Sequence, residues 1–145
     1  IYFKPVYDEL VKLDFKSQVQ LWAEWMRIHS RGGFKLVTED DKRVTFHLDP
    51  CGTGARMLRA GFYGPPKNLF ILKGPQPLTF GREELPIYCS HCAVIHHIAP
   101  IEWGGAPYPV VDPAKDQVEE PCYFHFYKDP KEVPEEYYRR VGKRK

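Results

Sequence analysis

The sequence predicts a small α+β protein: an antiparallel sheet with an N-terminal helical segment packed on it, a loop-rich middle held by a metal, and a short C-terminal helix. Three observations support this fold class. Apolar residues recur at helical spacing near the start, two later segments alternate apolar and polar residues as strands do, and four cysteines lie in or beside irregular segments. With 145 residues, the chain has the usual size of one domain, so residues 1–145 are expected to share one core.

The first expected element is helical and covers residues 6–30. Its apolar side chains recur mostly three or four residues apart, at Leu10, Leu13, Phe15, Val19, Trp22 and Met26. Asp14 is expected to cap a second helix after a short break, because its carboxylate can accept hydrogen bonds from free N–H groups at a helix start. The apolar stripe of this segment would cover one face of the sheet.

Residues 34–48 are expected to form a hairpin. Val44, Phe46 and Leu48 alternate with Thr45 and His47, so one face of the second strand would be buried. A short helix over residues 55–59 is expected next, followed by a strand over 68–72. Residues 62–87 hold many of the prolines and glycines, which is typical of an irregular connection.

The second half of the chain is expected to add one short helix, two strands and a closing helix. Residues 93–99 would form a helical turn or two, which Pro100 would stop. Strands are expected over 108–111 and 122–127, and in the latter Cys122, Phe124 and Phe126 share one face. A closing helix is expected over 133–141, with Pro134 in its first turn.

Charge and hydropathy argue against two classes of partner. The 21 basic and 19 acidic residues give a net charge of +2, which is too balanced to predict nucleic-acid binding. No apolar run approaches the roughly 18–20 residues that cross a bilayer, so no membrane is expected and a cytoplasmic location is the default. The chain begins at Ile1, so it is left open whether further residues or a leader precede it. A homo-oligomer or a subunit of a larger complex is also left open.

The cysteines predict a metal site. Cys89 and Cys92 have the Cys-x-x-Cys spacing of a metal clip, and Cys51 and Cys122 lie on either side of them in the sequence. The simplest ligand set is Cys51, Cys89, Cys92 and Cys122 around one zinc ion, with Glu119 and His96 as alternates. Iron or an iron-sulfur cluster is the alternative cofactor, although iron-sulfur sites usually have more closely spaced cysteines.

A catalytic interpretation of Cys51 is left open. The two glycines that follow it, and a helix start, would favour a thiolate nucleophile with an oxyanion pocket. His47, His96 or His97 could act as its general base. His96 and His97 are adjacent and would point about 100° apart on a helix, so at most one of them could face a given ion.

Residues 89–127 resemble the zinc-binding part of the small-molecule sensor domains related to 4-vinyl reductase. The resemblance rests on Cys92, a Gly-containing turn at residues 102–107, and Glu119-x-x-Cys122 followed by Phe124. It implies Cys92, Glu119 and Cys122 as zinc ligands beneath an apolar ligand pocket. The family's further cysteine after Cys122 is missing, and residues 1–88 match no part of the family.

The leading functional hypothesis is therefore a zinc-binding single-domain protein whose metal is mainly structural and which binds a small apolar or aromatic ligand. One alternative is a cysteine- or zinc-dependent hydrolase or transferase acting on a small molecule. Another alternative is an accessory subunit of an enzyme complex. Whether the protein is an enzyme is left open.

Overall fold

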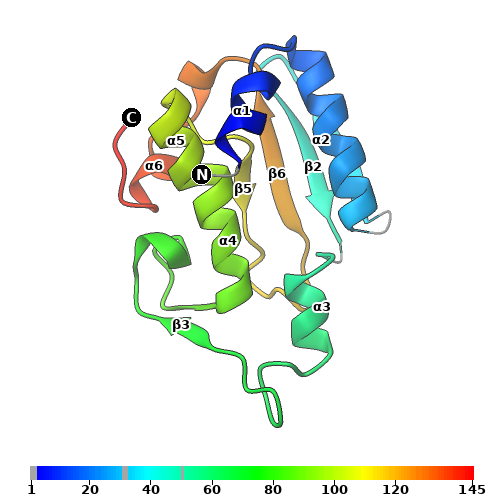
Figure 1. The fold of residues 1–145 in the computed structure, drawn as a ribbon, viewed down its shortest axis with the longest axis vertical. Coiled ribbons are helices and arrows are strands. Elements are labelled where there is room, and N and C mark those ends of the chain that lie inside the picture. Colours follow the sequence, from blue (N-terminus) through cyan, green and yellow to red (C-terminus); the bar gives the residue numbers. More distant parts are fainter. Residues whose placement is uncertain (1–2, 31–32, 50) are drawn as a thin grey trace.

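The computed structural model describes residues 3–30, 33–49 and 51–145, and it confirms the α+β fold class. Its main sheet contains β1 (Phe34–Glu39), β2 (Arg43–Leu48), β6 (Cys122–Tyr127) and β5 (Val110–Asp112), in that order and with antiparallel neighbours (Figure 1). The hairpin β1–β2 and the strand β6 lie where the alternation of apolar residues predicted them.

The register of the sheet places Cys122 at one end of its apolar face. Leu48 pairs with Cys122, and Phe46 pairs with Phe124. Phe124 and Phe126 are almost fully buried in the main core, as their shared face with Cys122 predicted. Because β2 ends at Leu48, the chain leaves the sheet beside Cys122 and reaches Cys51 three residues later.

Helices cover this apolar face. The N-terminal segment forms α1 (Lys4–Leu10) and α2 (Phe15–His29), separated by the predicted break. Asp14 caps α2 by accepting a hydrogen bond from the Ser17 N–H at 3.0 Å, also as predicted. The buried side chains Val19, Trp22 and Met26 of α2 pack on the sheet.

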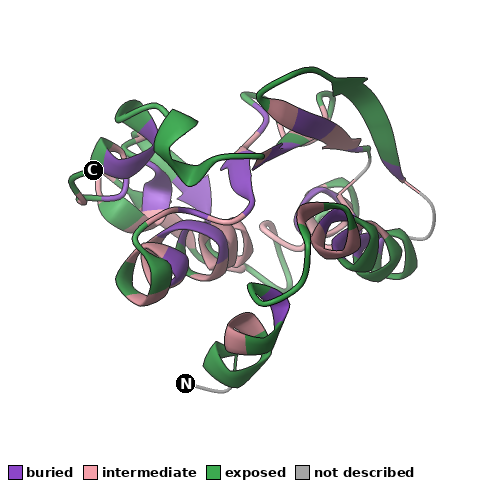
Figure 2. Ribbon diagram, turned by 90° about the horizontal axis from the view of Figure 1, so that it is seen from above, coloured by how far each residue is buried: buried purple, intermediate pink, exposed green. Residues whose placement is uncertain are grey.

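A second helical stretch, called the central helix below, lies beside α2. It contains α4 (Ser90–Cys92), the π-helical turn η3 (Ala93–Ile98) and α5 (Ala99–Gly104), and it follows the 3₁₀ turn η2 (Ile87–Cys89). Figure 2 shows α1 lying across the space between α2 and the central helix. Between β2 and the central helix, the chain also forms the short helix α3 (Gly54–Arg59), close to its predicted position.

The prediction that Pro100 stops a helix is wrong. Proline lacks an N–H and clashes with the carbonyl four residues earlier, which here belongs to His96. The π-helical turn precedes Pro100, and the His96 carbonyl accepts the N–H of Tyr108 at 2.8 Å instead. The helix therefore continues to Gly104 and ends at Gly105, whose φ of 82° is accessible to glycine.

Other boundaries differ modestly from the sequence prediction. The strand expected over residues 68–72 is β3 (Ile71–Lys73), which pairs with β4 (Glu84–Pro86) in a two-stranded sheet, and a 3₁₀ turn η1 (Pro77–Thr79) lies between them. The closing helix is shorter than predicted: a 3₁₀ turn η4 (Pro130–Glu132) precedes α6 (Glu136–Arg139). Short turns of this kind carry too few residues for a periodic pattern.

Side chains from the helices form hydrogen bonds with the backbone groups on the outer edge of β5. The Val111 N–H donates to His97 Nε2 at 2.9 Å, and Arg140 donates to the Val111 carbonyl. Arg140 also donates to Asp112 Oδ1 at 2.7 Å, while Tyr137 and His125 donate to Asp112 Oδ2, each at 3.0 Å. This network joins the C-terminal segment to the sheet and prevents the edge from pairing with another strand. Among the described helices, none has both the length and the apolar character that a membrane span requires.

Candidate metal centre and the adjoining groove

The structure brings all four cysteines to one small cavity, called the thiol cavity below. Cys51 lies just before α3, Cys89 and Cys92 lie at the start of the central helix, and Cys122 begins β6. The cavity has a volume of about 20 Å³, and Gly54, Tyr88, His91 and Gln117 also contribute to its walls. Since a single water needs roughly 10–15 Å³ on this measure, there is room for one small ion.

Gly54 has no side chain and therefore leaves space for two of the sulfurs. A Cβ atom at Gly54 would lie 2.8 Å from Cys89 Sγ and 3.8 Å from Cys51 Sγ. Gly54 is buried at the first position of α3. Local sequence around Gly54 cannot indicate this role, because Gly54 and Cys89 are 35 residues apart in the chain.

All four cysteines are free thiols. In the described parts of the chain, no three or more His, Cys, Asp and Glu side chains already stand in the arrangement of a metal site. Zinc binds thiolates at about 2.3 Å in a tetrahedron, so the thiol rotamers would have to converge on an ion.

Burial favours the protonated form of three of these thiols, those of Cys89, Cys92 and Cys122. It raises the pKa of Cys89 to about 12 and that of Cys122 to about 11, and it raises the pKa of Cys92 well above the ordinary value. The neighbouring cysteines add to each increase, and Arg82 opposes it for Cys89 and Cys122. A divalent cation would supply the missing positive charge and would release protons as it bound.

Arg82 holds a loop beside Cys122. Its guanidinium donates to the Ala114 carbonyl at 2.6 Å and to the Pro113 carbonyl. The Ala114 N–H in turn points to Cys122 Sγ at 3.4 Å. The loop therefore directs one backbone N–H group at the Cys122 sulfur, as is common around metal-bound sulfur.

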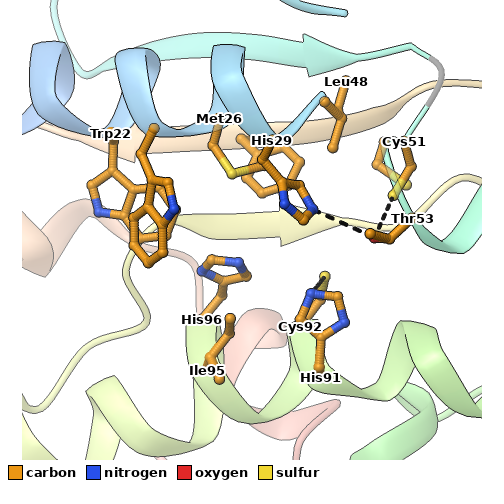
Figure 3. A pocket seen from close by; sticks show the side chains of 13 residues that line it. Trp22, Met26, His29, Leu48, Cys51, Thr53, His91, Cys92, Ile95 and His96 are labelled. Carbon is orange, nitrogen blue, oxygen red and sulfur yellow. Dashed lines mark hydrogen bonds between the residues drawn. The ribbon is translucent and has the colours of Figure 1, made fainter. Parts of the chain in front are cut away.

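A wider cavity of about 90 Å³ opens on the other side of the thiols. Cys51, Cys92 and Cys122 contribute to both cavities. Figure 3 shows Trp22, Met26 and His29 projecting from α2 towards the side chains His91, Ile95 and His96 of the central helix. Leu48 and Phe124 of the sheet also contribute to its walls.

His96 and His97 point in different directions, as their adjacency predicted. The His96 ring packs against Trp22 and Phe124, with centroid distances of 5.0 and 5.7 Å. His97 contacts β5 and the C-terminal segment instead. The pKa of His96 lies well below its usual value, mainly because the ring is buried, so its imidazole is uncharged at neutral pH.

The other candidate residues lie apart from the thiol cavity. Glu119 is exposed in the turn before β6 and does not contribute to the cavity wall. His47 pairs with Tyr123 across β2 and β6, whereas its neighbour Leu48 faces the wider cavity. The alternation of a strand therefore puts His47 on the opposite face of the sheet from Cys122.

A polar chain that the sequence analysis missed begins at Cys51. Cys51 Sγ lies 3.7 Å from Thr53 Oγ1, which lies 3.5 Å from His29 Nε2 (Figure 3). His29 is the last residue of α2 and is exposed. The structure thus connects His29, rather than His47, to Cys51 through the Thr53 hydroxyl.

Comparison with known proteins found no matching protein family, no similar curated protein and no similar solved structure.

The space at Gly54 gives a first testable prediction. Gly54→Ala puts a methyl group 2.8 Å from Cys89 Sγ, so the thiol must move. We expect a loss of about 1–3 kcal/mol in the free energy of unfolding, although alanine in a helix otherwise gains about 0.5–1 kcal/mol over glycine. Urea unfolding measures the change.

The matched control is Gly64→Ala, whose new Cβ would meet the nearest heavy atom, the Gly61 carbonyl oxygen, at an ordinary 3.7 Å. This variant should unfold within about 0.5 kcal/mol of the parent protein. Equal stability of Gly54→Ala and the parent would contradict the close contact with Cys89.

Proposed function

We propose that the protein binds one zinc ion through the thiolates of Cys51, Cys89, Cys92 and Cys122, and that the metal is mainly structural. The observation that carries this proposal is the meeting of the four thiols, from three separate segments, around one cavity with a glycine in its wall. Four thiolates form a closed zinc site with no open position for catalysis.

The size of the thiol cavity favours a single ion over a cluster. A volume of about 20 Å³ fits one ion, whereas an iron-sulfur cluster contains at least two irons and two sulfides. A tetrahedral set of four sulfurs is typical of zinc. The 4-vinyl reductase resemblance would add Glu119, but its exposed position favours the four-thiolate set.

Zinc at this position would fix one end of the wider cavity. It would tie the start of α3, the start of the central helix and the start of β6 together, and three of its ligands contribute to that cavity. The free energy of binding a structural metal adds to folding stability. We therefore propose that the zinc holds the walls of a binding site for a small apolar or aromatic molecule.

Metal analysis tests this proposal. Protein purified without added zinc is expected to contain one zinc ion per chain, and a thiol reagent should modify the four cysteines only after chelation. The control is Cys89→Ser, which should lose the metal. Substoichiometric metal together with four freely reactive thiols in the native protein would contradict the proposal.

The chain from Cys51 through Thr53 to His29 favours one alternative, a cysteine-dependent hydrolase or transferase. In that case Cys51 Sγ would attack an electrophilic carbon of the substrate while His29 accepts the thiol proton through the Thr53 hydroxyl, and the proton would pass to the leaving group as its bond to that carbon breaks. Iodoacetamide at neutral pH distinguishes the two functions. Selective alkylation of Cys51 in zinc-loaded protein supports the nucleophile, whereas protection of Cys51 by zinc supports ligation.

A further inference from the structure

Buried polar atoms without hydrogen-bond partners gather along the space between α2 and the central helix. Among the described residues, four buried side-chain nitrogen or oxygen atoms lack a partner, and three of them are Trp22 Nε1, His96 Nδ1 and Tyr108 Oη. Trp22 is 8% exposed and His96 is 2% exposed. Since a buried polar group without a partner costs stability, three in one place need an explanation.

These atoms belong to residues around two adjoining cavities. The wider cavity of about 90 Å³ includes Trp22 and His96, and a second cavity of about 50 Å³ includes Trp22 and Tyr108. Trp22, Trp25 and Ile95 contribute to both, so together the cavities form one groove, called the aromatic groove below. It runs from the cysteines of the wider cavity, part of which Figure 3 shows, to Tyr7 and Leu10 of α1.

The walls of the aromatic groove favour a flat, uncharged molecule. Six of the nine residues around the second cavity are aromatic: Phe3, Tyr7, Trp22, Trp25, Trp103 and Tyr108. No Asp, Glu, Lys or Arg occurs among the described residues of either cavity. A charged ligand would lose its hydration there without a carboxylate, ammonium or guanidinium group to pair with.

Size and hydrogen bonding narrow the ligand further. A dry cavity of about 150 Å³ holds one benzene molecule, so adjoining spaces of about 90 and 50 Å³ suit a molecule with a single ring. An indole N–H is a donor only, so the ligand must offer an acceptor to Trp22. Tyr108 and His96, each with a buried polar atom that lacks a partner, also contribute to the walls of the groove.

We propose that the aromatic groove binds an uncharged single-ring aromatic molecule whose oxygen accepts a hydrogen bond from Trp22 Nε1. This inference names the ligand class of the small-molecule site proposed above, and so rests on that part of the proposed function. It does not require the zinc ion, because neither Trp22 nor Tyr108 contributes to the thiol cavity.

Three probes of similar size test the ligand class. Acetophenone carries a carbonyl acceptor, isopropylbenzene has nearly the same shape without oxygen, and benzoate carries a charge. We expect acetophenone to bind about fivefold more tightly than isopropylbenzene, from one added hydrogen bond, and benzoate to bind more weakly than either. In a ¹⁵N spectrum, acetophenone should move the Trp22 indole N–H signal downfield and isopropylbenzene should not.

Two variants localise the hydrogen bond. Trp22→Phe keeps an aromatic ring but removes the donor, so it should abolish the preference for acetophenone over isopropylbenzene. The control is Trp25→Phe, because Trp25 contributes to the same two cavities but is 47% exposed. This variant should change the affinity for both compounds alike and keep the preference.

Several results would overturn the inference: no binding of acetophenone, equal binding of isopropylbenzene, tighter binding of benzoate, or an unchanged preference in Trp22→Phe. Each titration is made on zinc-loaded and on chelated protein, with the metal content measured. Acetophenone binding without any zinc site would reject the metal proposal alone. Stoichiometric zinc without acetophenone binding would reject the ligand proposal alone.

Discussion

Cys89→Ser is expected to abolish zinc binding and to lower the free energy of unfolding by about 5–6 kcal/mol in zinc-saturated buffer. Most of this loss, about 4 kcal/mol, follows from linkage, because an ion at about a thousand times its Kd stabilises the state that binds it by that amount. Cys89 is the thiol closest to the space at Gly54 and begins the Cys-x-x-Cys clip. Urea unfolding with and without zinc measures the effect.

The zinc-free protein provides the control for this substitution. There, Cys89→Ser should cost only the burial of a hydroxyl, about 1–2 kcal/mol. The difference between the two conditions is the part due to the metal. An equal loss with and without zinc would show that Cys89 acts as a core residue and not as a ligand.

Arg140→Met is expected to lower the free energy of unfolding by about 2–3 kcal/mol at neutral pH. Arg140 pairs with Asp112 at 2.7 Å and also donates to the Val111 carbonyl. Breaking a fully buried pair costs about 3–5 kcal/mol; the smaller figure applies here because the Asp112 side chain is 37% exposed. The control is Lys143→Met, which removes the more exposed pair with Glu102 and should cost less than about 1 kcal/mol.

The same substitution has a defined pH dependence. Burial by itself would raise the pKa of Asp112, but hydrogen bonds from His125, Arg140 and Tyr137 outweigh burial and hold that pKa well below its usual range. A carboxylate with a lowered folded pKa stabilises the protein above its unfolded pKa of about 4, and this contribution is lost as the pH falls through the folded pKa.

The stability difference between Arg140→Met and the parent protein should therefore be constant from about pH 7 to 5 and shrink below about pH 4. Chelated protein is used, so that protonation of zinc ligands does not contribute. Urea unfolding at several pH values measures the difference. A difference that stays constant down to pH 2 would contradict the role of the Asp112 charge.

Local patterns predicted the elements that are long enough to show a period. The 15 residues of α2, its Asp14 cap and the six-residue strands β2 and β6 lie where spacing and alternation placed them. Pro100 gave a misleading signal because the penalty of proline depends on the carbonyl of His96, and that carbonyl binds the distant Tyr108 N–H. Long-range hydrogen bonds of this kind have no trace in a local window.

The sequence by itself determined the fold class, the strand face that carries Cys122 and the set of four cysteines, because residue type and period suffice for these. Only the tertiary structure decided that the four thiols share one cavity, that Gly54 makes room for them, and that His29 rather than His47 lies near Cys51. It also decided that Trp22, His96 and Tyr108 share one groove with unpartnered polar atoms. The physical reason is that these relations join residues far apart in the chain, whose distances depend on strand register and helix packing.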